Sequence, residues 1–316
     1  MIKYFADWIT YNLLSLSPKG LLAEAVNFFT YETVKIFFLL MVIIFVVSFI
    51  RSFLPPEKIR KILSAKRKHY GNALAALLGI ITPFCSCSAI PLFLGFVEAG
   101  VPLGVTFSFL VSSPMINEVA LVMLLGLFGW RIALIYTLSG LGIAIISGIV
   151  IGRLKVESLV EDFVYKSKAG KAADPLKMSL AERVNYATTY TFDIIKQIWP
   201  HVVIGIGIGA WIHGYVPTDF LARYAGRSTW YAVPLATLLG IPLYSNAAGI
   251  IPLISVLTEK GVSMGTSLAF MMAVVGLSLP AFMILRKVMK VKLLVIFASI
   301  VGIGIMFTGY LFNLIL

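Results

Sequence analysis

Long apolar runs separated by short polar segments dominate this chain. Several runs hold 18 or more residues with few charges, and at about 1.5 Å per residue each can cross about 30 Å of hydrocarbon. We therefore predict an all-α polytopic membrane protein. Its expected spans are residues 33–53, 101–127, 130–152, 192–212, 262–285 and 291–316. Two further apolar stretches, 72–97 and 230–257, are interrupted in the middle, so hydropathy alone gives about eight helices.

The interruption at residues 82–91 combines two prolines with both cysteines of the chain and several small polar residues. Proline removes a backbone donor and clashes with the preceding turn. In lipid such a break is tolerated only where it lines a protein cavity, so we interpret this stretch as one wall of a site. The prolines expected to mark helix breaks along the chain are Pro83, Pro91, Pro114, Pro252 and Pro280.

The two halves of the chain resemble each other at a shift of 161 residues. Residues 78–80 (Leu-Gly-Ile) fall on 239–241, and residues 90–92 (Ile-Pro-Leu) fall on 251–253, without a gap. Matches in such number at a single shift indicate an internal duplication. The expected segments are an interfacial amphipathic stretch at 1–30, a first transmembrane repeat at 31–152, a basic linker at 153–190 and a second transmembrane repeat at 191–316.

Charge gives an orientation. The formal net charge of +12 is concentrated in the segments 51–70, 153–190 and 286–292, and basic loops favour the cytoplasmic side. If 72–97 dips into the membrane and returns, with arms of about 15 Å, all three segments are cytoplasmic. The repeats are then inverted, each with about three spans and one broken, re-entrant hairpin. A full crossing by 72–97 remains the alternative.

The tips of the two hairpins would face each other near the middle of the membrane. The expected substrate contacts are Cys85, Ser86, Cys87, Ser88, Tyr244, Ser245 and Asn246. Thiolates are preferred ligands of soft centres, and Cys85 and Cys87 together suit a trivalent metalloid that already carries one carbon group. Alternatively the cysteines are buried apolar residues or a redox dithiol, and the serines and Asn246 cap broken helix ends.

Three polar residues at membrane depth are candidates for coupling. Glu118 follows Asn117 within an expected span, and an ionisable residue there suggests a proton carrier or a counter-charge. His201 is a second titratable group within a span. The alternatives are an interfacial glutamate and a histidine satisfied within the helix bundle.

Four motifs resemble one known family. They are residues 83–88 (Pro-Phe-Cys-Ser-Cys-Ser), 100–104 (Gly-Val-Pro-Leu-Gly), 113–118 (Ser-Pro-Met-Ile-Asn-Glu) and 240–246 (Gly-Ile-Pro-Leu-Tyr-Ser-Asn). They look like the predicted-permease family that includes the ArsP-type organoarsenical efflux permeases. The resemblance implies a multi-pass permease of the prokaryotic cytoplasmic membrane, exporting trivalent methylated or aromatic arsenicals. It also implies a binding role for Cys85 and Cys87.

We therefore expect a secondary transporter rather than an enzyme. It would export trivalent organoarsenicals or a related soft, thiol-reactive solute, without a cofactor or nucleic acid. The sequence holds no ATP-binding loop. Its partners would be the lipid bilayer and the solute, with a homo-oligomer left open. A membrane thiol oxidoreductase and an uncoupled channel are the alternatives.

Overall fold

The computed structural model describes residues 2–17, 20–53, 70–82, 86–161, 179–215, 230–243, 247–259 and 261–316. Within these ranges every named element is a helix. The first half contains α1 (Ile2–Asp7), the π-helix η1 (Trp8–Leu13), α2 (Leu21–Arg51), α4 (Tyr70–Ile81), α5 (Ser86–Glu98), α6 (Leu103–Met115), α7 (Glu118–Phe128), α8 (Trp130–Arg153) and the short 3₁₀ helix η2 (Glu157–Leu159). The second half contains α10 (Leu180–Tyr215), α12 (Ala232–Gly240), α13 (Ala247–Glu259), α14 (Met264–Gly276), α15 (Leu279–Leu285) and α16 (Val291–Ile315).

The expected multi-pass membrane protein is confirmed. In the described ranges four stretches are long and apolar enough to cross a membrane: Leu21–Val46, Trp130–Arg153, Met264–Leu285 and Val291–Ile315. The pair α6 and α7 gives a fifth if it is counted as one span, although it is bent by 45°. The expected span at 101–127 is therefore a broken helix rather than a straight one.

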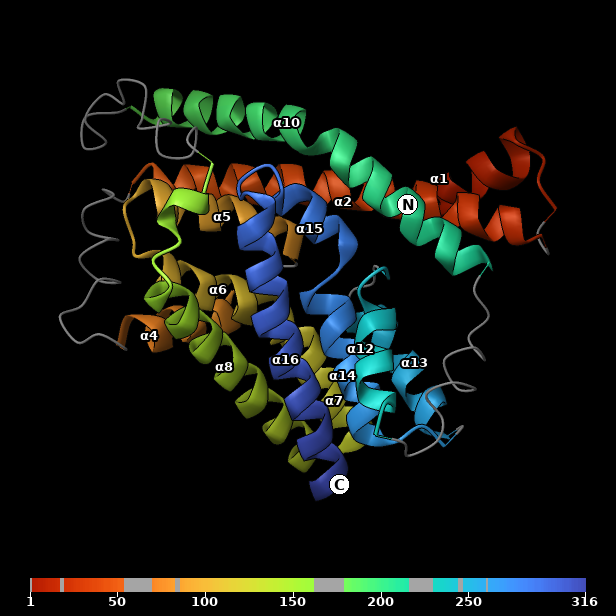
Figure 1. The fold of residues 1–316 in the computed structure, drawn as a ribbon. Coiled ribbons are helices and arrows are strands. Elements are labelled where there is room, and N and C mark those ends of the chain that lie inside the picture. The colour runs from red at the N-terminus through yellow and green to blue at the C-terminus, as the bar shows by residue number, and fades with distance from the viewer. Residues whose placement is uncertain are drawn as a thin grey trace.

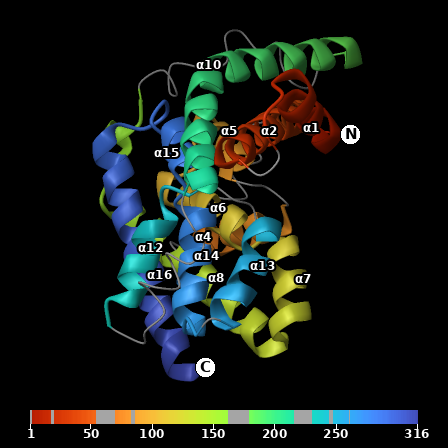
Figure 2. The ribbon, with the colours of Figure 1, turned by 90° about the vertical axis from the view of Figure 1, so that its right-hand side faces the viewer.

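The helix that opens the second half is longer than its predicted span at 192–212. Ser179 and Glu182 form a capping box: the Ser179 N–H donates to Glu182 Oε2 (2.7 Å), and the Glu182 N–H donates to Ser179 Oγ (3.3 Å). The backbone hydrogen bond from Ser179 lowers the pKa of the Glu182 carboxyl. This box starts α10 itself, which continues to Tyr215. The helix contains Pro200, and Figure 2 shows it bent part-way along, as proline in a helix requires.

The helices of the two halves correspond at the shift found in the sequence. The bounds of α5 and α13, and those of α6 and α14, are each 161 residues apart at both ends. The helices α7 and α15, and likewise α8 and α16, start 161 residues apart. The turns after α5 and α13 are also alike, because Gly100 and Gly261 both have positive φ (76° and 88°), a conformation that favours glycine.

In the first half, three helices meet at glycines. A Cβ on Gly104 of α6 would overlap the carbonyl oxygen of Gly148 on α8. The Asn72 side chain of α4 donates to the Gly104 carbonyl (3.1 Å) and to Ser108 Oγ (3.0 Å). The start of α4, the start of α6 and the end of α8 therefore lie together. As a result, the α4–α5 hairpin begins and ends on the same side of the bundle.

The second half repeats this junction with different side chains. A Cβ on Gly265 of α14 would overlap the Gly309 carbonyl of α16, and a Cβ on Gly309 would lie 2.6 Å from a methyl of Val233 on α12. The Gly265 N–H donates to Asn313 Oδ1 at 2.8 Å. The α12–α13 hairpin thus also returns to the side from which it starts.

Two pairs of equivalent residues touch each other. A Cβ on Gly276 would lie 3.1 Å from Met115 Cε, and a Cβ on Gly304 would lie 3.2 Å from Ile143. Each pair is separated by 161 residues. Equivalent residues meet in this way only where the halves are related by a rotation that exchanges them, so these contacts mark an approximate two-fold axis.

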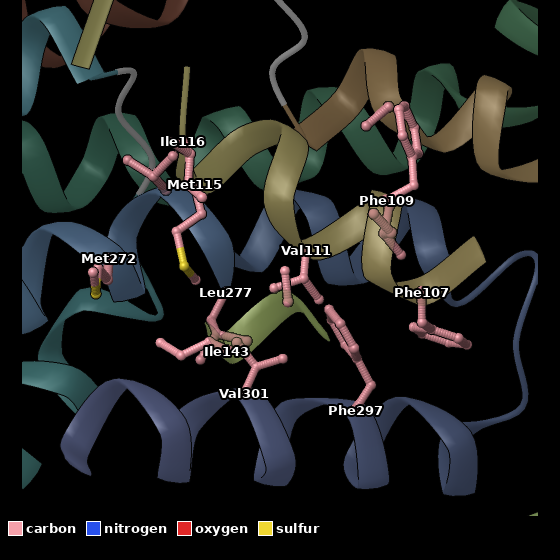
Figure 3. Packing of buried hydrophobic residues seen from close by; sticks show 14 of the residues in the cluster. Phe107, Phe109, Val111, Met115, Ile116, Ile143, Met272, Leu277, Phe297 and Val301 are labelled. Carbon is pink, nitrogen blue, oxygen red and sulfur yellow. The ribbon is translucent and has the colours of Figure 1, made fainter. Parts of the chain in front are cut away.

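The helix contacts follow the same exchange. Equivalent helices pack together as α2 with α10, α6 with α14 and α8 with α16, while α5 packs on α15 and α7 packs on α13. Figure 1 shows α2 and α10 side by side across one end of the bundle formed by the other helices. Figure 3 shows the core between the halves, where the Phe107 and Phe297 rings lie 5.4 Å apart. Leu277 and Val301, both buried, lie beside Met115 in the same view.

We predict that Gly148→Ala destabilises the protein by about 1–3 kcal/mol, because the added methyl group would overlap Ser108 Oγ and the Gly104 carbonyl. Thermal unfolding in detergent measures the change. Gly142→Ala is the matched control in the same helix, since nothing lies within 4 Å of its Cβ and alanine favours helix over glycine. Equal unfolding temperatures for the two variants would contradict the close crossing.

Candidate functional site

The break that carries the two cysteines lies between α4 and α5. The helix α4 ends at Ile81, and the next residue, Thr82, donates its hydroxyl to the carbonyls of Leu78 and Gly79, both at 3.0 Å. These bonds satisfy two of the carbonyls that a helix end leaves free. The helix α5 begins at Ser86. The interruption predicted from the sequence is therefore present.

The candidate ligands at this break lie largely outside the described part of the structure. Pro83 and Cys85 are outside the described residues, and Ser86, Cys87 and Ser88 are described only as backbone in the first turn of α5. The break itself is thus positioned by the structure, while the binding role of its side chains stays a prediction.

The second break lies between α12 and α13. The helix α12 ends at Gly240, with a turn in which the Leu243 N–H donates to the Gly240 carbonyl at 3.1 Å, and α13 begins at Ala247. The Ile241 carbonyl accepts from the Leu279 N–H at 2.9 Å, which joins this break to the start of α15. Tyr244, Ser245 and Asn246 are outside the described residues.

A third break, between α6 and α7, was not predicted as such. Asn117 is the N-cap of α7, and its side chain accepts from the Ala120 N–H at 2.7 Å. Glu118 is the first residue of α7 and is exposed, where its charge favours the positive end of the helix dipole. The assignment of Asn117 as a capping residue is clear from this geometry. The structure leaves a coupling role for Glu118 as a prediction.

The buried Tyr136 of α8 holds this third break in place. Its hydroxyl donates to the Met115 carbonyl at 2.7 Å, at the last residue of α6. Gly140, one turn further along α8, makes room for Ile116, because a Cβ there would be 2.9 Å from that side chain. Sequence reasoning missed Tyr136 as a site residue. The available signal was the pair Asn117-Glu118 directly after Pro114, which has the form of a new helix start.

A fourth break, between α14 and α15, is the equivalent of the third. Ser278 is the N-cap of α15, and its side chain makes no capping hydrogen bond. The tyrosine of the first half is replaced here by Phe297, which has no hydroxyl to bind the end of α14. The two breaks therefore share backbone geometry but differ in how they are held.

The five prolines expected to break helices divide into three groups. Pro114 lies near the end of α6, and Pro280 lies at the start of α15, so both stand next to a break as expected. Pro91 and Pro252 lie inside α5 and α13, which continue through them, so the expected breaks at these two residues are wrong. Each removes a single helical hydrogen bond, which a membrane helix tolerates. Pro83 is outside the described residues.

His201 lies within α10 directly after Pro200. Its side chain is outside the described part of the structure, so its coupling role stays a prediction. The described backbone places it on the helix that packs along α2 and against α15.

The helical architecture and the breaks agree with a comparison of the whole sequence. The profile of a family described as predicted permeases matches residues 21–314. The chain belongs to this family of predicted permeases. No solved structure matches the chain significantly.

Three curated relatives place this permease more closely. A UPF0718 protein of Methanocaldococcus jannaschii is 24% identical over 74% of this chain and 81% of its own length. A protein of Streptococcus mutans, whose name proposes a subunit of a two-component membrane permease complex, is 25% identical over 78% of this chain and 76% of its own length. A UPF0718 protein of Escherichia coli is 21% identical over 83% of this chain and 73% of its own length.

We predict that Tyr136→Phe lowers the stability of this permease by about 1–3 kcal/mol, because the Met115 carbonyl would lose its buried partner. The ring itself would still fit, as Phe297 does at the equivalent position. The thermal unfolding midpoint in detergent is the measurement. Tyr4→Phe, at a ring that is 80% exposed, is the control and should match wild type. A Tyr136→Phe protein with the wild-type midpoint would argue against the hydrogen bond.

Proposed function

We propose that this permease is a secondary transporter built from two inverted repeats, each with three spans and a re-entrant hairpin. The contact between equivalent residues Ile143 and Gly304 carries this proposal, because it joins α8 and α16 across an approximate two-fold axis. These helices run in opposite directions, since the segment after α8 pairs with the start of α16 through the bridge between Val160 and Met289. An axis between two antiparallel spans lies in the membrane plane, which is the arrangement of inverted-repeat transporters.

The re-entrant hairpins follow from the glycine junctions. Asn72 contacts Gly104, so both ends of the α4–α5 hairpin lie at the end of α8 that carries Gly148. In the second half, Val233 and Gly265 meet at Gly309, towards the far end of α16. Antiparallel α8 and α16 place these two junctions on opposite sides of the membrane. The first hairpin would therefore enter from one side and the second from the other.

The basic segments favour the cytoplasmic side for the first junction. The linker after α8 contacts the loop before α16, where Arg286 lies 3.3 Å from Glu161 and Lys290 Nζ donates to the Ser158 carbonyl at 3.0 Å. At the other end of the linker, Arg183 donates to the Ser52 carbonyl, directly before the segment 54–69. These contacts link the three basic segments to one another, in agreement with the positive-inside rule.

The proposed substrate is a trivalent organoarsenical or a related soft, thiol-reactive solute, bound by Cys85 and Cys87 at the α4–α5 break. The break supports a site there because the start of α5 is free of the preceding helix, and thiolates suit soft centres. The second tip, with Tyr244, Ser245 and Asn246, would complete the site, together with Ser86 and Ser88. The arsenical class comes from the family resemblance.

Coupling would use protons, with Glu118 and then His201 as the candidate carriers. Glu118 begins α7, and α7 packs against α13, whose first turn follows the second tip. The direction of transport would be export across the cytoplasmic membrane of a prokaryote. Thiol oxidoreduction and uncoupled channel flux are the two alternatives, and each predicts a different outcome in a flux measurement.

We expect everted membrane vesicles that contain the wild-type protein to accumulate methylarsenous acid when energised. Cys85→Ser and Cys87→Ser should each lower the initial rate at least tenfold, because a single thiol holds the trivalent centre much more weakly. Purified protein in proteoliposomes, without a second subunit, should give the same result. Absent wild-type accumulation, or wild-type rates in both variants, would contradict the arsenical proposal. Flux that does not saturate would favour a channel.

The topology has its own test, which uses single cysteines in a protein that lacks Cys85 and Cys87. A cysteine at Glu98 should react with a membrane-impermeant maleimide only from the cytoplasmic side. A cysteine at the equivalent Glu259 should react only from outside, because the second hairpin enters from that side. Labelling of both positions from one side would exclude inverted repeats.

A further inference from the structure

The helix α6 carries a buried hydroxyl that the fold leaves unused. Ser113 is fully buried, and its Oγ has no hydrogen-bond partner among the described residues. Serines in helices usually donate to a carbonyl three or four residues earlier, as Ser108 and Ser112 of the same helix do. Pro114 has no N–H, so the Leu110 carbonyl lacks its usual helical donor and is available to Ser113. The Ser113 hydroxyl does not take this acceptor.

Ser113 lies at the level of the cysteine break. The end of α4 packs on this part of α6, because a Cβ on Gly79 would be 3.0 Å from the Ser113 N–H nitrogen and 3.1 Å from the Phe109 carbonyl oxygen. The helices α5 and α6 form an antiparallel hairpin around the turn at Gly100, with the ring of Phe96 packed on that of Phe109 at 5.2 Å. Both helices have 13 residues, so the last turn of α6 lies level with the first turn of α5, which contains Cys87.

The second half has the same backbone without the hydroxyl. A Cβ on Gly240 of α12 would be 2.9 Å from Ala273 Cβ and 3.2 Å from the Val274 nitrogen. These residues are the equivalents of Ser112 and Ser113. The α12–α14 crossing therefore needs no hydroxyl to pack, and structure alone does not account for Ser113. The polar group occurs only in the repeat that holds the cysteines.

We propose that the Ser113 hydroxyl binds an oxygen of the transported solute and so selects soft solutes that also carry hydroxyl groups. This inference rests on the proposed function. A hydroxyl both donates and accepts, so it suits a neutral arsenous acid of the class RAs(OH)₂, with one organic group and two hydroxyls. The cysteines would recognise the soft centre, and Ser113 would recognise an oxygen on it before any thiol exchange.

Ser113→Thr and Ser113→Val form a matched pair, because their side chains have nearly the same shape and differ in the hydroxyl. In proteoliposomes supplied with methylarsenous acid, we expect Ser113→Val to raise KM about tenfold with the maximal rate within about twofold of wild type. Ser113→Thr should keep KM within about threefold. Ser267→Ala removes another buried, unpartnered hydroxyl, on α14, and should leave KM unchanged.

Each outcome bears on a different claim. If wild type accumulates methylarsenous acid and the threonine and valine variants share one KM, the Ser113 proposal is overturned while the proposed function stands. If wild type shows no accumulation, both are overturned. Thermal unfolding in detergent checks that the variants are folded, and Ser113→Ala, which adds no atoms, replaces the valine variant if that protein unfolds. A KM increase for Ser113→Ala then supports the proposal, and an unchanged KM overturns it.

Discussion

The close approach of three helices at a pair of glycines is the contact on which this fold depends. At Gly104 and Gly148, backbone meets backbone, and the start of α4 is tied to the same place by Asn72. Lipid provides little hydrophobic force to hold helices together, so association relies on packing and on interhelical hydrogen bonds. The junction supplies both. Because it gathers the two ends of a hairpin, α4 and α5 can stop short of a full crossing and leave a break inside the protein.

The second half repeats the backbone of this junction and changes its side chains. Val233 and Ala269 stand where Asn72 and Ser108 stand in the first half, and Asn313 provides a polar contact from the other helix. The same separation holds at the breaks, where Tyr136 corresponds to Phe297. A duplicated backbone thus tolerates a change of chemistry as long as the glycines remain, because the crossing distance depends on the absence of a Cβ.

Much of this architecture could be predicted from the sequence, because the apolar runs and the 161-residue shift are local properties that survive in one chain. The two hairpin breaks were found since proline and small polar residues interrupt apolar runs there. The breaks after Met115 and Gly276 were missed because the apolar pattern continues through them, and only the cap residues Asn117 and Ser278 signal a new helix. Pro91 and Pro252 misled for the opposite reason, since proline marks strain without fixing where a helix ends.

The site was less predictable than the fold, because it depends on which helix ends meet in space. The sequence places Ser113 within a long apolar span, where a serine usually bonds to its own helix. Only the crossing of α4 over α6 at Gly79 shows that this serine lies at the end of the cysteine-bearing hairpin. An approximate two-fold axis offers two equivalent places for a site, one in each half. Cysteines and a free hydroxyl occur in one of them alone, so a symmetric scaffold would bind its solute asymmetrically while its backbone opens to either side of the membrane.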